Sequence, residues 1–287
     1  MSDLRDLLKV EPGTLRPADV DPRGTPGLPP KREVGKDPKK WSAGEVAEIS
    51  SELGAYQEKL FASAKEGITR QRVLLLLQAM DCGGKDGTVR NVIRGMNPVG
   101  IKAVSFGPPD DEERQHDFLW RIRRALPHSG HLGIFNRSQY EDVLVVRVHA
   151  LVPESQWSQR YDQINTFEAE QVEAGLAVVK VMLHISKEEQ RKRLLARLDD
   201  PTKQWKYNPG DLEERARWDD YQQAYQDALT KCSAGAAPWY VVPADRKWYR
   251  NWAVATLLHR AMAELDPQYP EPDFDVAAER KKVLEAA

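Results

Sequence analysis

Five short apolar runs, separated by stretches with helical periodicity, restrict the folds that this chain can adopt. The runs are Val73–Gln78, Ile101–Phe106, Leu132–Phe135, Val178–Ile185 and Trp239–Val242, and the helical stretches between them are Thr88–Met96, Asp111–Leu126, Ser155–Ala174 and Lys187–Leu229. Nearly continuous apolar runs are typical of strands that are buried on both faces, and helical crossovers allow successive strands to run parallel. The pattern therefore predicts an α/β fold with a five-stranded parallel sheet and helices on both faces.

The turn after the first run has the layout of a phosphate-binding loop. Residues 79–88 read AMDCGGKDGT, so glycines and a lysine lie between a strand and a helix. Backbone N–H groups in such a turn and the positive end of the helix dipole attract an anion, and Lys85 adds a full charge. The pattern Gly-x-x-x-x-Gly-Lys-[Ser/Thr] is matched incompletely, because Ala79 replaces the first glycine and Asp86 replaces the hydroxyl residue. We infer phosphoryl transfer, and the alternative is a turn whose charges only face solvent. The expected phosphate-binding residues of this turn are Gly83, Gly84, Lys85, Asp86, Gly87 and Thr88.

A second motif follows the third run, where residues 135–142 read FNRSQYED. Ligands of parallel sheets bind beyond the carboxyl ends of the strands, so this motif and the glycine turn should face the same crevice. The Arg137 guanidinium can contact phosphate oxygens through two parallel hydrogen bonds, and the alternative is a structural ion pair with Glu141 or Asp142. Asn136 occupies the place where P-loop enzymes usually have a metal-linked carboxylate. A second metal ligand must then come from Asp81, Asp86, Glu141 or Asp142.

Residues 112–124 contain charges at helical spacing. Asp117, Arg121 and Arg124 share one face of the expected helix. An ion pair between Asp117 and Arg121 is as compatible with this spacing as contact with a ligand.

A longer basic stretch lies between the fourth and fifth runs. Arg193 and Arg197 share one helix face, and Pro201 divides the segment into two arms. A solvated helix face is the ordinary interpretation of such charges. Beside a phosphate loop, the segment of about residues 187–217 is also typical of a basic lid that closes over phosphates and excludes water.

The ends of the chain differ from this α/β pattern. Residues 1–40 contain seven prolines, which predict an extended arm that covers the body, covers a neighbouring subunit or is disordered. The capping box Ser42-x-x-Glu45 predicts the start of the first long helix. We therefore divide the chain into a proline-rich arm (1–40), a P-loop phosphotransferase domain (41–265) and a loose tail (266–287).

Charge and cysteine content limit the expected partners and compartment. The net charge of −2 argues against a general attraction to nucleic acid or to an anionic membrane. The two cysteines do not make a disulfide framework, and no apolar run reaches the ~18 residues of a membrane span. We expect a cytoplasmic protein with no nucleic-acid or membrane partner.

Taken in order, the motifs resemble those of the polyphosphate kinase 2 family from about residue 40 to 260. The matching segments are Gln78-Ala79-Met80-Asp81 leading into Gly84-Lys85-Asp86-Gly87-Thr88, His116-Asp117-Phe118-Leu119-Trp120-Arg121, Phe135-Asn136-Arg137-Ser138, Tyr140-Glu141-Asp142-Val143-Leu144-Val145, Trp205-Lys206, Arg217-Trp218-Asp219-Asp220-Tyr221 and Ala237-Pro238-Trp239-Tyr240-Val241. The resemblance implies a P-loop kinase fold with a helical lid and a homo-oligomer, either tetramer or dimer. It also implies phosphoryl transfer between inorganic polyphosphate and nucleotides, with Mg²⁺ or Mn²⁺.

Positions within these motifs imply roles for individual residues. Asp81, Lys85 and Arg137 resemble the catalytic residues. The resemblance implies that polyphosphate is bound by Arg193, Arg197 and Lys206, together with the glycine turn and Arg137. It implies that the nucleotide is bound by Asp81, Asp117, Arg121, Asn136 and Glu141. It implies that the metal is bound by Asp81 and Glu141.

One departure from the family motif indicates a class. Much of the family reads Phe-Asp-Arg-Ser where this chain has Phe135-Asn136-Arg137-Ser138, which resembles the third class, whose members accept nucleoside mono- and diphosphates such as AMP and ADP. Two alternatives remain. One is an ATP-dependent kinase of a nucleotide or small metabolite on the same fold, and the other is a non-catalytic nucleotide-binding module.

Overall fold

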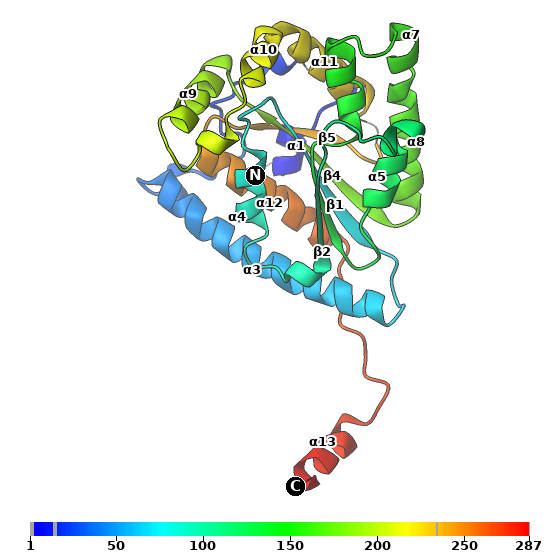
Figure 1. Ribbon diagram of the computed structural model, residues 1–287. Coiled ribbons are helices and arrows are strands. Elements are labelled where there is room, and N and C mark those ends of the chain that lie inside the picture. Colours follow the sequence, from blue (N-terminus) through cyan, green and yellow to red (C-terminus); the bar gives the residue numbers. More distant parts are fainter. Residues whose placement is uncertain (1–2, 14–15, 234, 287) are drawn as a thin grey trace.

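A five-stranded parallel sheet lies at the centre of the structure, a computed structural model that describes residues 3–13, 16–233 and 235–286 (Figure 1). The strands are β1 (Arg72–Gln78), β2 (Ile101–Ser105), β3 (Leu132–Asn136), β4 (Leu176–His184) and β5 (Trp239–Pro243), and their order across the sheet is β2-β3-β1-β4-β5. Each predicted apolar run forms one of these strands. The expected fold class is therefore confirmed.

β1 occupies the middle of the sheet because its side chains are apolar on both faces. Val73–Leu77 are all buried. β1 pairs in parallel with β3 on one side and with β4 on the other, and Leu77 lies opposite Asn136 and Val181. Consequently the turns that follow β1 and β3 leave the sheet side by side. This register brings the glycine turn next to the motif after the third strand, as the sequence predicts.

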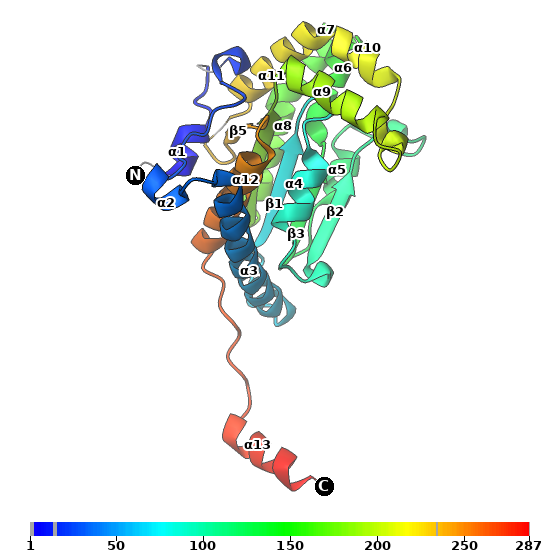
Figure 2. The same cartoon turned by 90° about the vertical axis from the view of Figure 1, so that its left-hand side faces the viewer.

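Helices cover both faces of the sheet. The helices are α1 (Leu4–Leu8), α2 (Lys31–Val34), α3 (Pro38–Lys65), α4 (Lys85–Val92), α5 (Trp120–Ala125), α6 (Val145–Val148), α7 (Glu154–Trp157), α8 (Arg160–Glu173), α9 (Lys187–Leu198), α10 (Gly210–Ala216), α11 (Trp218–Lys231), α12 (Lys247–Glu264) and α13 (Val276–Glu285). α3, α4 and α12 lie on one face of the sheet, and α5 and α8 lie on the other (Figures 1 and 2). α9 and α10 lie above the end of the sheet that carries the glycine turn.

Three of the four predicted helical stretches are interrupted. Asp111–Leu126 contains a 3₁₀ turn and then α5, Ser155–Ala174 contains α7 and α8, and Lys187–Leu229 contains α9, α10 and α11. α9 ends at Leu198, shortly before Pro201, because proline lacks the N–H that would continue the helix. The periodicity therefore predicted the positions of the helices but not the breaks between them.

The described part of residues 1–40 covers the body of the protein, which is one of the expected arrangements, but it forms short helices instead of an extended segment. α1 buries Leu4 and Leu8, and the Val10 amide donates to the Trp239 carbonyl at 2.9 Å. The Tyr249 hydroxyl donates to the carbonyl of Pro26 at 2.7 Å. Sparse apolar side chains and backbone contacts thus hold the arm despite its prolines. Residues 1–2 and 14–15 of the predicted arm lie outside the described residues, as does residue 287 of the tail.

The first long helix starts earlier than its expected capping box. α3 begins at Pro38, and the Asp37 side chain accepts from the backbone amides of Lys39 and Lys40. Aspartate at the N-cap followed by proline at the first helical position satisfies the helix end. The Ser42 hydroxyl donates instead to the Trp248 carbonyl at 2.8 Å. The capping-box prediction is therefore wrong, because Ser42 lies inside the helix and contacts α12.

The tail contains one more helix than the sequence predicts. Its first residues contact the body, where the Ser63 hydroxyl donates to the Gln268 carbonyl at 2.6 Å. α13 then stands away from the body (Figure 1). No helix in the described ranges is long and apolar enough to cross a membrane.

Candidate active site

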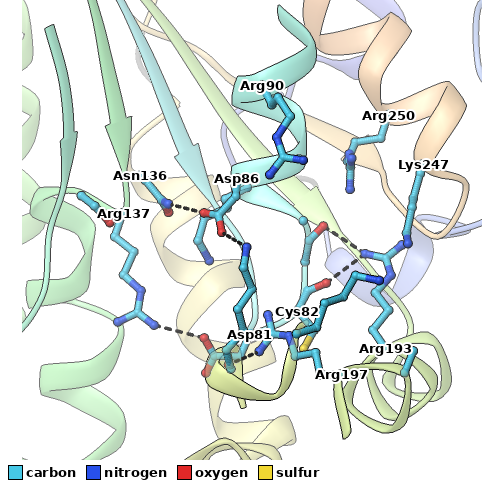
Figure 3. Close-up of a pocket in the computed structure, with 18 of the residues that line it drawn as sticks. Asp81, Cys82, Asp86, Arg90, Asn136, Arg137, Arg193, Arg197, Lys247 and Arg250 are labelled. Carbon is cyan, nitrogen blue, oxygen red and sulfur yellow. Dashed lines mark hydrogen bonds and ion pairs between the residues drawn. The ribbon is translucent and has the colours of Figure 1, made fainter. Parts of the chain in front are cut away.

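A cavity of about 710 Å³ opens at the carboxyl ends of β1, β2 and β3 (Figure 3). We call it the basic cavity, because nine lysines and arginines but only two aspartates line it among the described residues. The basic residues are Lys85, Arg90, Arg137, Arg193, Arg197, Lys203, Lys206, Lys247 and Arg250, and the aspartates are Asp81 and Asp86. A concave surface with this excess of positive charge attracts a polyanion.

The floor of the basic cavity is the glycine turn, whose backbone requires glycine at two positions. Gly84 has φ +101°, and a Cβ there would lie 1.9 Å from the Arg250 Nη1 atom. A Cβ on Gly83 would lie 2.3 Å from that of Ala79. Thr88 is fully buried, and its hydroxyl donates to the Gly84 carbonyl at 3.2 Å. The predicted phosphate-binding residues therefore surround the cavity except for Thr88, which stabilises the first turn of α4.

Lys85 stands at the start of α4, with its ammonium group held over the turn. Its Nζ donates to the Ala79 carbonyl at 3.0 Å. Burial lowers the pKa of Lys85, and the negative charge of Asp81 opposes this effect. The lysine is thus a half-buried cation at the bottom of the cavity. Cys82 also lies in the turn, but burial raises the pKa of its thiol to about 11, which leaves the thiol protonated at neutral pH.

Arg137 and Asp81 form an ion pair that joins the turns after β3 and β1. The Arg137 Nη2 atom lies 3.1 Å from the Asp81 Oδ1 atom. Burial opposes the guanidinium charge, but Glu141 and Asp81 outweigh it and raise the pKa of Arg137. Asp142 pairs with Arg160 at 3.0 Å. Arg137 therefore pairs with Asp81 and not with Glu141 or Asp142, the two partners that the sequence left open for a structural ion pair.

A buried network beneath Arg137 holds its loop in place. Arg137 has φ +65°, which non-glycine residues rarely adopt. The next residue, Ser138, accepts from the Gln78 side chain at 3.0 Å. Tyr140, fully buried, donates to Glu168 at 2.8 Å and accepts from Lys180 at 2.8 Å. Fixing the backbone on both sides of Arg137 in this way sets the direction of its side chain.

A second cavity of about 350 Å³ lies on the other side of the Asp81–Arg137 pair. Both residues of the pair line both cavities. The second cavity, here called the junction cavity, is otherwise aromatic and acidic, with Tyr221, Tyr225, Glu141, Asp211 and Glu214 in its wall. Burial raises the pKa of Glu141, and the positive charges of Arg137 and Lys85 oppose this effect. This lining suits a neutral ring system better than a bare polyanion.

The predicted lid residues lie together over the basic cavity. Arg193 is buried, donates to the carbonyls of Cys82 and Gly83 at 2.9 and 3.1 Å, and pairs with Glu189 at 2.8 Å. It is therefore not part of a solvated helix face. Arg197 pairs with Asp211 at 3.2 Å.

Lys206 lines the same cavity, and its backbone carbonyl accepts from the Arg197 guanidinium at 3.0 Å. It pairs with Asp86 at 3.3 Å, and the same Asp86 carboxylate accepts from the Asn136 side chain at 2.9 Å. Asn136 therefore faces the basic cavity rather than the junction cavity.

Two other predicted site residues lie elsewhere. Asp117 and Arg121 belong to the lining of neither the basic cavity nor the junction cavity. Asp117 pairs with Arg123 at 2.9 Å, and Arg121 lies 3.3 Å from Glu113. The expected ion pair between Asp117 and Arg121 is replaced by these contacts, because Asp117 precedes α5 instead of lying within a longer helix.

Sequence reasoning did not assign four cations of the basic cavity to the site: Arg90 on α4, Lys203 after α9, and Lys247 and Arg250 on α12. Arg250 is 3 % exposed, and burial together with the nearby charge of Arg193 lowers its pKa to about 10. Burial and the charges of Arg193 and Arg250 also lower the pKa of Lys247. The sequence did contain an indication of two of these residues. Lys247 and Arg250 follow the fifth predicted strand, so they should lie at the same edge of the sheet as the other motifs.

The described residues contain no cluster of three or more His, Cys, Asp or Glu side chains arranged to hold a metal ion. Asp81 and Glu141 do line the junction cavity together. The Asp81 Oδ1 atom contacts Arg137, so its second carboxylate oxygen remains available. Mg²⁺ commonly binds through one or two carboxylates plus phosphate oxygens and water, and these two side chains fit such a set.

Comparisons with known proteins agree on one family. The sequence pattern of polyphosphate kinase 2 (PPK2) matches residues 39–270. An AMP/ADP-polyphosphate phosphotransferase from Meiothermus ruber is 48 % identical over 240 residues, which cover 84 % of this chain and 87 % of that protein. An ADP-polyphosphate phosphotransferase from Rhodopseudomonas palustris is 44 % identical over 245 residues, which cover 81 % and 82 %.

The solved structures give the same result. The crystal structure of polyphosphate kinase 2 from Arthrobacter aurescens TC1 superposes with a TM-score of 0.93 at 48 % identity, covering 99 % of this chain and 97 % of that one. The glycine turn after β1 and the parallel sheet are accordingly those of a P-loop kinase fold. The chain belongs to the polyphosphate kinase 2 family.

Proposed function

We propose that this enzyme transfers a phosphoryl group between inorganic polyphosphate and nucleotides, with AMP and ADP as acceptors and with Mg²⁺ as cofactor. The observation that supports this most strongly is the pair of cavities that meet at Asp81 and Arg137. One is lined by cations, and the other by aromatic and acidic side chains. The names of the relatives from Meiothermus ruber and Rhodopseudomonas palustris support the same substrates.

In this proposal polyphosphate occupies the basic cavity and the nucleotide occupies the junction cavity. The reacting phosphates meet beside Arg137, which lines both cavities. Lys85 and Arg137 neutralise charge on the transferring group, and Arg193, Arg197 and Lys206 hold the polyphosphate. Asp81 and Glu141 hold Mg²⁺. When bound there, the metal would neutralise negative charge on the phosphate oxygens.

The residues present suit a reaction that depends on position and charge. A nucleotide phosphate has its second pKa near ~6, so it is already largely anionic at pH 7 and needs no strong general base. Phosphoryl transfer is mostly positioning plus electrostatic stabilisation. We infer that residues 187–217 act as a lid that excludes water. Asp117 and Arg121 line neither cavity, although the Arg121 guanidinium donates to the carbonyl of Gly107, which lines the basic cavity. We propose that Asp117 and Arg121 contribute to nucleotide binding when the lid or an oligomer brings them closer.

The family also supports a homo-oligomer, and we propose a tetramer or a dimer. Sedimentation of the full chain measures this independently of activity. A monomer at micromolar concentration would remove the oligomer from the proposal without affecting the chemistry.

The test of the activity is conversion of AMP and ADP by the purified protein with Mg²⁺, followed by chromatography. Parallel reactions contain polyphosphate or ATP as the donor, and a reaction with ADP alone corrects for disproportionation. We expect AMP to yield ADP and then ATP when polyphosphate is the donor. If polyphosphate converts ADP but not AMP, polyphosphate remains the donor and AMP is excluded as an acceptor. Transfer from ATP but not from polyphosphate would favour the ATP-dependent kinase.

A further inference from the structure

The cations of the basic cavity fall into two groups that differ in their partners. Those of the predicted lid are neutralised, since Arg193, Arg197, Lys203 and Lys206 each pair with a carboxylate. Arg90, Lys247 and Arg250 have no carboxylate within 4.0 Å in the described ranges of the chain. Uncompensated positive charge therefore lies on the side formed by α4 and α12, as Figure 3 shows for these three residues.

A smaller groove continues from this side of the basic cavity. It has a volume of about 160 Å³ and is lined by residues of α3, α4 and α12, three helices that lie on the same face of the sheet in Figure 2. Its lining residues are Lys39, Ser42, Ala43, Val46 and Ala47 of α3, Asn91 of α4, Arg94 of the turn that follows α4, and Trp248 and Asn251 of α12. We call it the α3–α4–α12 groove.

The groove adjoins the basic cavity along two helices. On α4, Arg90 lines the basic cavity and Asn91 lines the groove. On α12, Arg250 lines the basic cavity and Asn251 lines the groove. Arg94 lies in the turn that follows the end of α4 at Val92, and it also lines the groove. Positive side chains thus continue from Arg90 in the basic cavity to Arg94 in the groove.

The groove has the character of a site for an anion. Arg94 and Lys39 are exposed and line the groove, and neither has a carboxylate within 4.0 Å in the portion of the chain that the structure describes. No aspartate or glutamate belongs to its lining. The Ser42 hydroxyl and the Asn91 amide already donate to the carbonyls of Trp248 and Gly87, so the attraction for an anion comes from Lys39 and Arg94.

We propose that the α3–α4–α12 groove is a second binding site for polyphosphate, which holds the part of a long chain distal to the reacting end. A linear chain whose terminal phosphate lies beside Arg137 runs through the basic cavity past Arg250 and Arg90, and continues over Arg94 and Lys39. Short donors end within the basic cavity and do not reach the groove. This inference rests on polyphosphate being the donor, as proposed above.

The test compares the dependence of the rate on long and short donors. The variants are Arg94→Glu and Lys39→Glu, and both positions are exposed, so the substitutions should leave the fold intact. The matched control is Lys65→Glu, an exposed lysine at the opposite end of α3, roughly 40 Å away at about 1.5 Å per residue. The donors are long-chain polyphosphate and linear hexaphosphate, with ADP as the acceptor.

We expect Arg94→Glu and Lys39→Glu each to raise the KM for long-chain polyphosphate about three- to ten-fold, the range for one phosphate contact weakened at a partly exposed site. The KM for hexaphosphate, the kcat and the behaviour of Lys65→Glu should stay at wild-type values. An equal rise in the KM for both donors would overturn the inference, because it would show that the substitutions act only through the overall electrostatic potential of the protein. Unchanged kinetics with long chains, while both donors still react, would also overturn it and leave the proposed function intact. Failure of the wild-type protein with both donors would instead reject the proposed function.

Discussion

Arg250 should stabilise a bound polyanion while destabilising the free protein. It is 3 % exposed and has no carboxylate partner among the described residues, and burial with the charge of Arg193 lowers its pKa from 12.5 to about 10. Each pKa unit corresponds to about 1.4 kcal/mol, so the folded state loses roughly 3 kcal/mol by keeping this group charged. Replacement by methionine removes the charge and retains the apolar stem. It also removes the hydrogen bonds to Asn251, which contribute about 1 kcal/mol.

The net effect of Arg250→Met on the free protein should be a gain of about 1–2 kcal/mol in the free energy of unfolding. For a chain of this size that corresponds to a rise in Tm of roughly 2–6 °C. Activity with polyphosphate should fall by about 10- to 100-fold, because a buried cation beside the glycine turn is lost. Polyphosphate should raise the Tm of the wild type more than that of the variant, since a ligand stabilises the state that it binds.

Scanning calorimetry with and without polyphosphate measures both effects. The matched control is Arg147→Met. Burial opposes the charge of Arg147, but the hydrogen bonds and charges of Asp227 and Tyr161 together outweigh burial and raise its pKa. Removing this guanidinium should therefore lower the Tm. The two substitutions are chemically the same and should change the stability in opposite directions.

The gain in stability from Arg250→Met should also depend on pH, in a direction that follows from the lowered pKa. A base with a lowered pKa destabilises the folded state at every pH below that pKa, and the penalty decreases as the folded state loses its proton. The Tm difference between Arg250→Met and the wild type should therefore be constant at neutral pH and shrink as the pH rises through about 10. A variant that is less stable than the wild type at pH 7 and equally active would refute this reasoning.

Three further predictions concern the glycine turn and the Arg137 loop. Lys85→Ala or Arg137→Ala should lower kcat by on the order of 10²–10³, as steady-state assays with saturating donor would measure, and near-normal turnover would remove that residue from the catalytic role. Tyr140→Phe should lower kcat several-fold, because it removes two hydrogen bonds beneath the Arg137 loop. The control Tyr249→Phe removes one hydrogen bond to the arm and should leave kcat unchanged. Equal effects of the two substitutions on kcat would mean that the network beneath Arg137 only stabilises the fold. Gly84→Ala should lower the Tm and raise the KM for polyphosphate, because φ is +101° and the new methyl group would overlap a guanidinium; unchanged values would show that the turn relaxes freely.

The sheet and the contact between the first two motifs could be predicted from local sequence. Each strand is an apolar run long enough to cross a covered sheet, and parallel pairing brings the ends of neighbouring strands together. Asp81, Lys85 and Arg137 lie close together for that reason. The breaks within the helical stretches could not be predicted from periodicity, which continues across a turn when both helices face the same core.

Other features depend on contacts between distant segments. The described part of the arm is held on the body because a few apolar side chains such as Leu4 and Leu8 pack against it. The surface that they pack against is formed by distant segments, so the local sequence of the arm does not indicate it. Arg250 enters the basic cavity because α12 passes close to Gly84, 166 residues earlier in the chain (250 − 84). Asp117 and Arg121 were expected to share one helix face, but α5 begins at Trp120, so Asp117 lies before the helix and pairs with Arg123 instead.

The central claim is that donor and acceptor approach the Asp81–Arg137 pair from two different cavities. A crystal structure of the slow Lys85→Ala variant with AMP and hexaphosphate tests it most directly. The account predicts the phosphate chain in the basic cavity, AMP in the junction cavity, and the facing phosphates beside Arg137, with the reacting atoms about 3–3.5 Å apart. Both ligands in one cavity, or hexaphosphate among Tyr221, Tyr225 and Glu214, would contradict it.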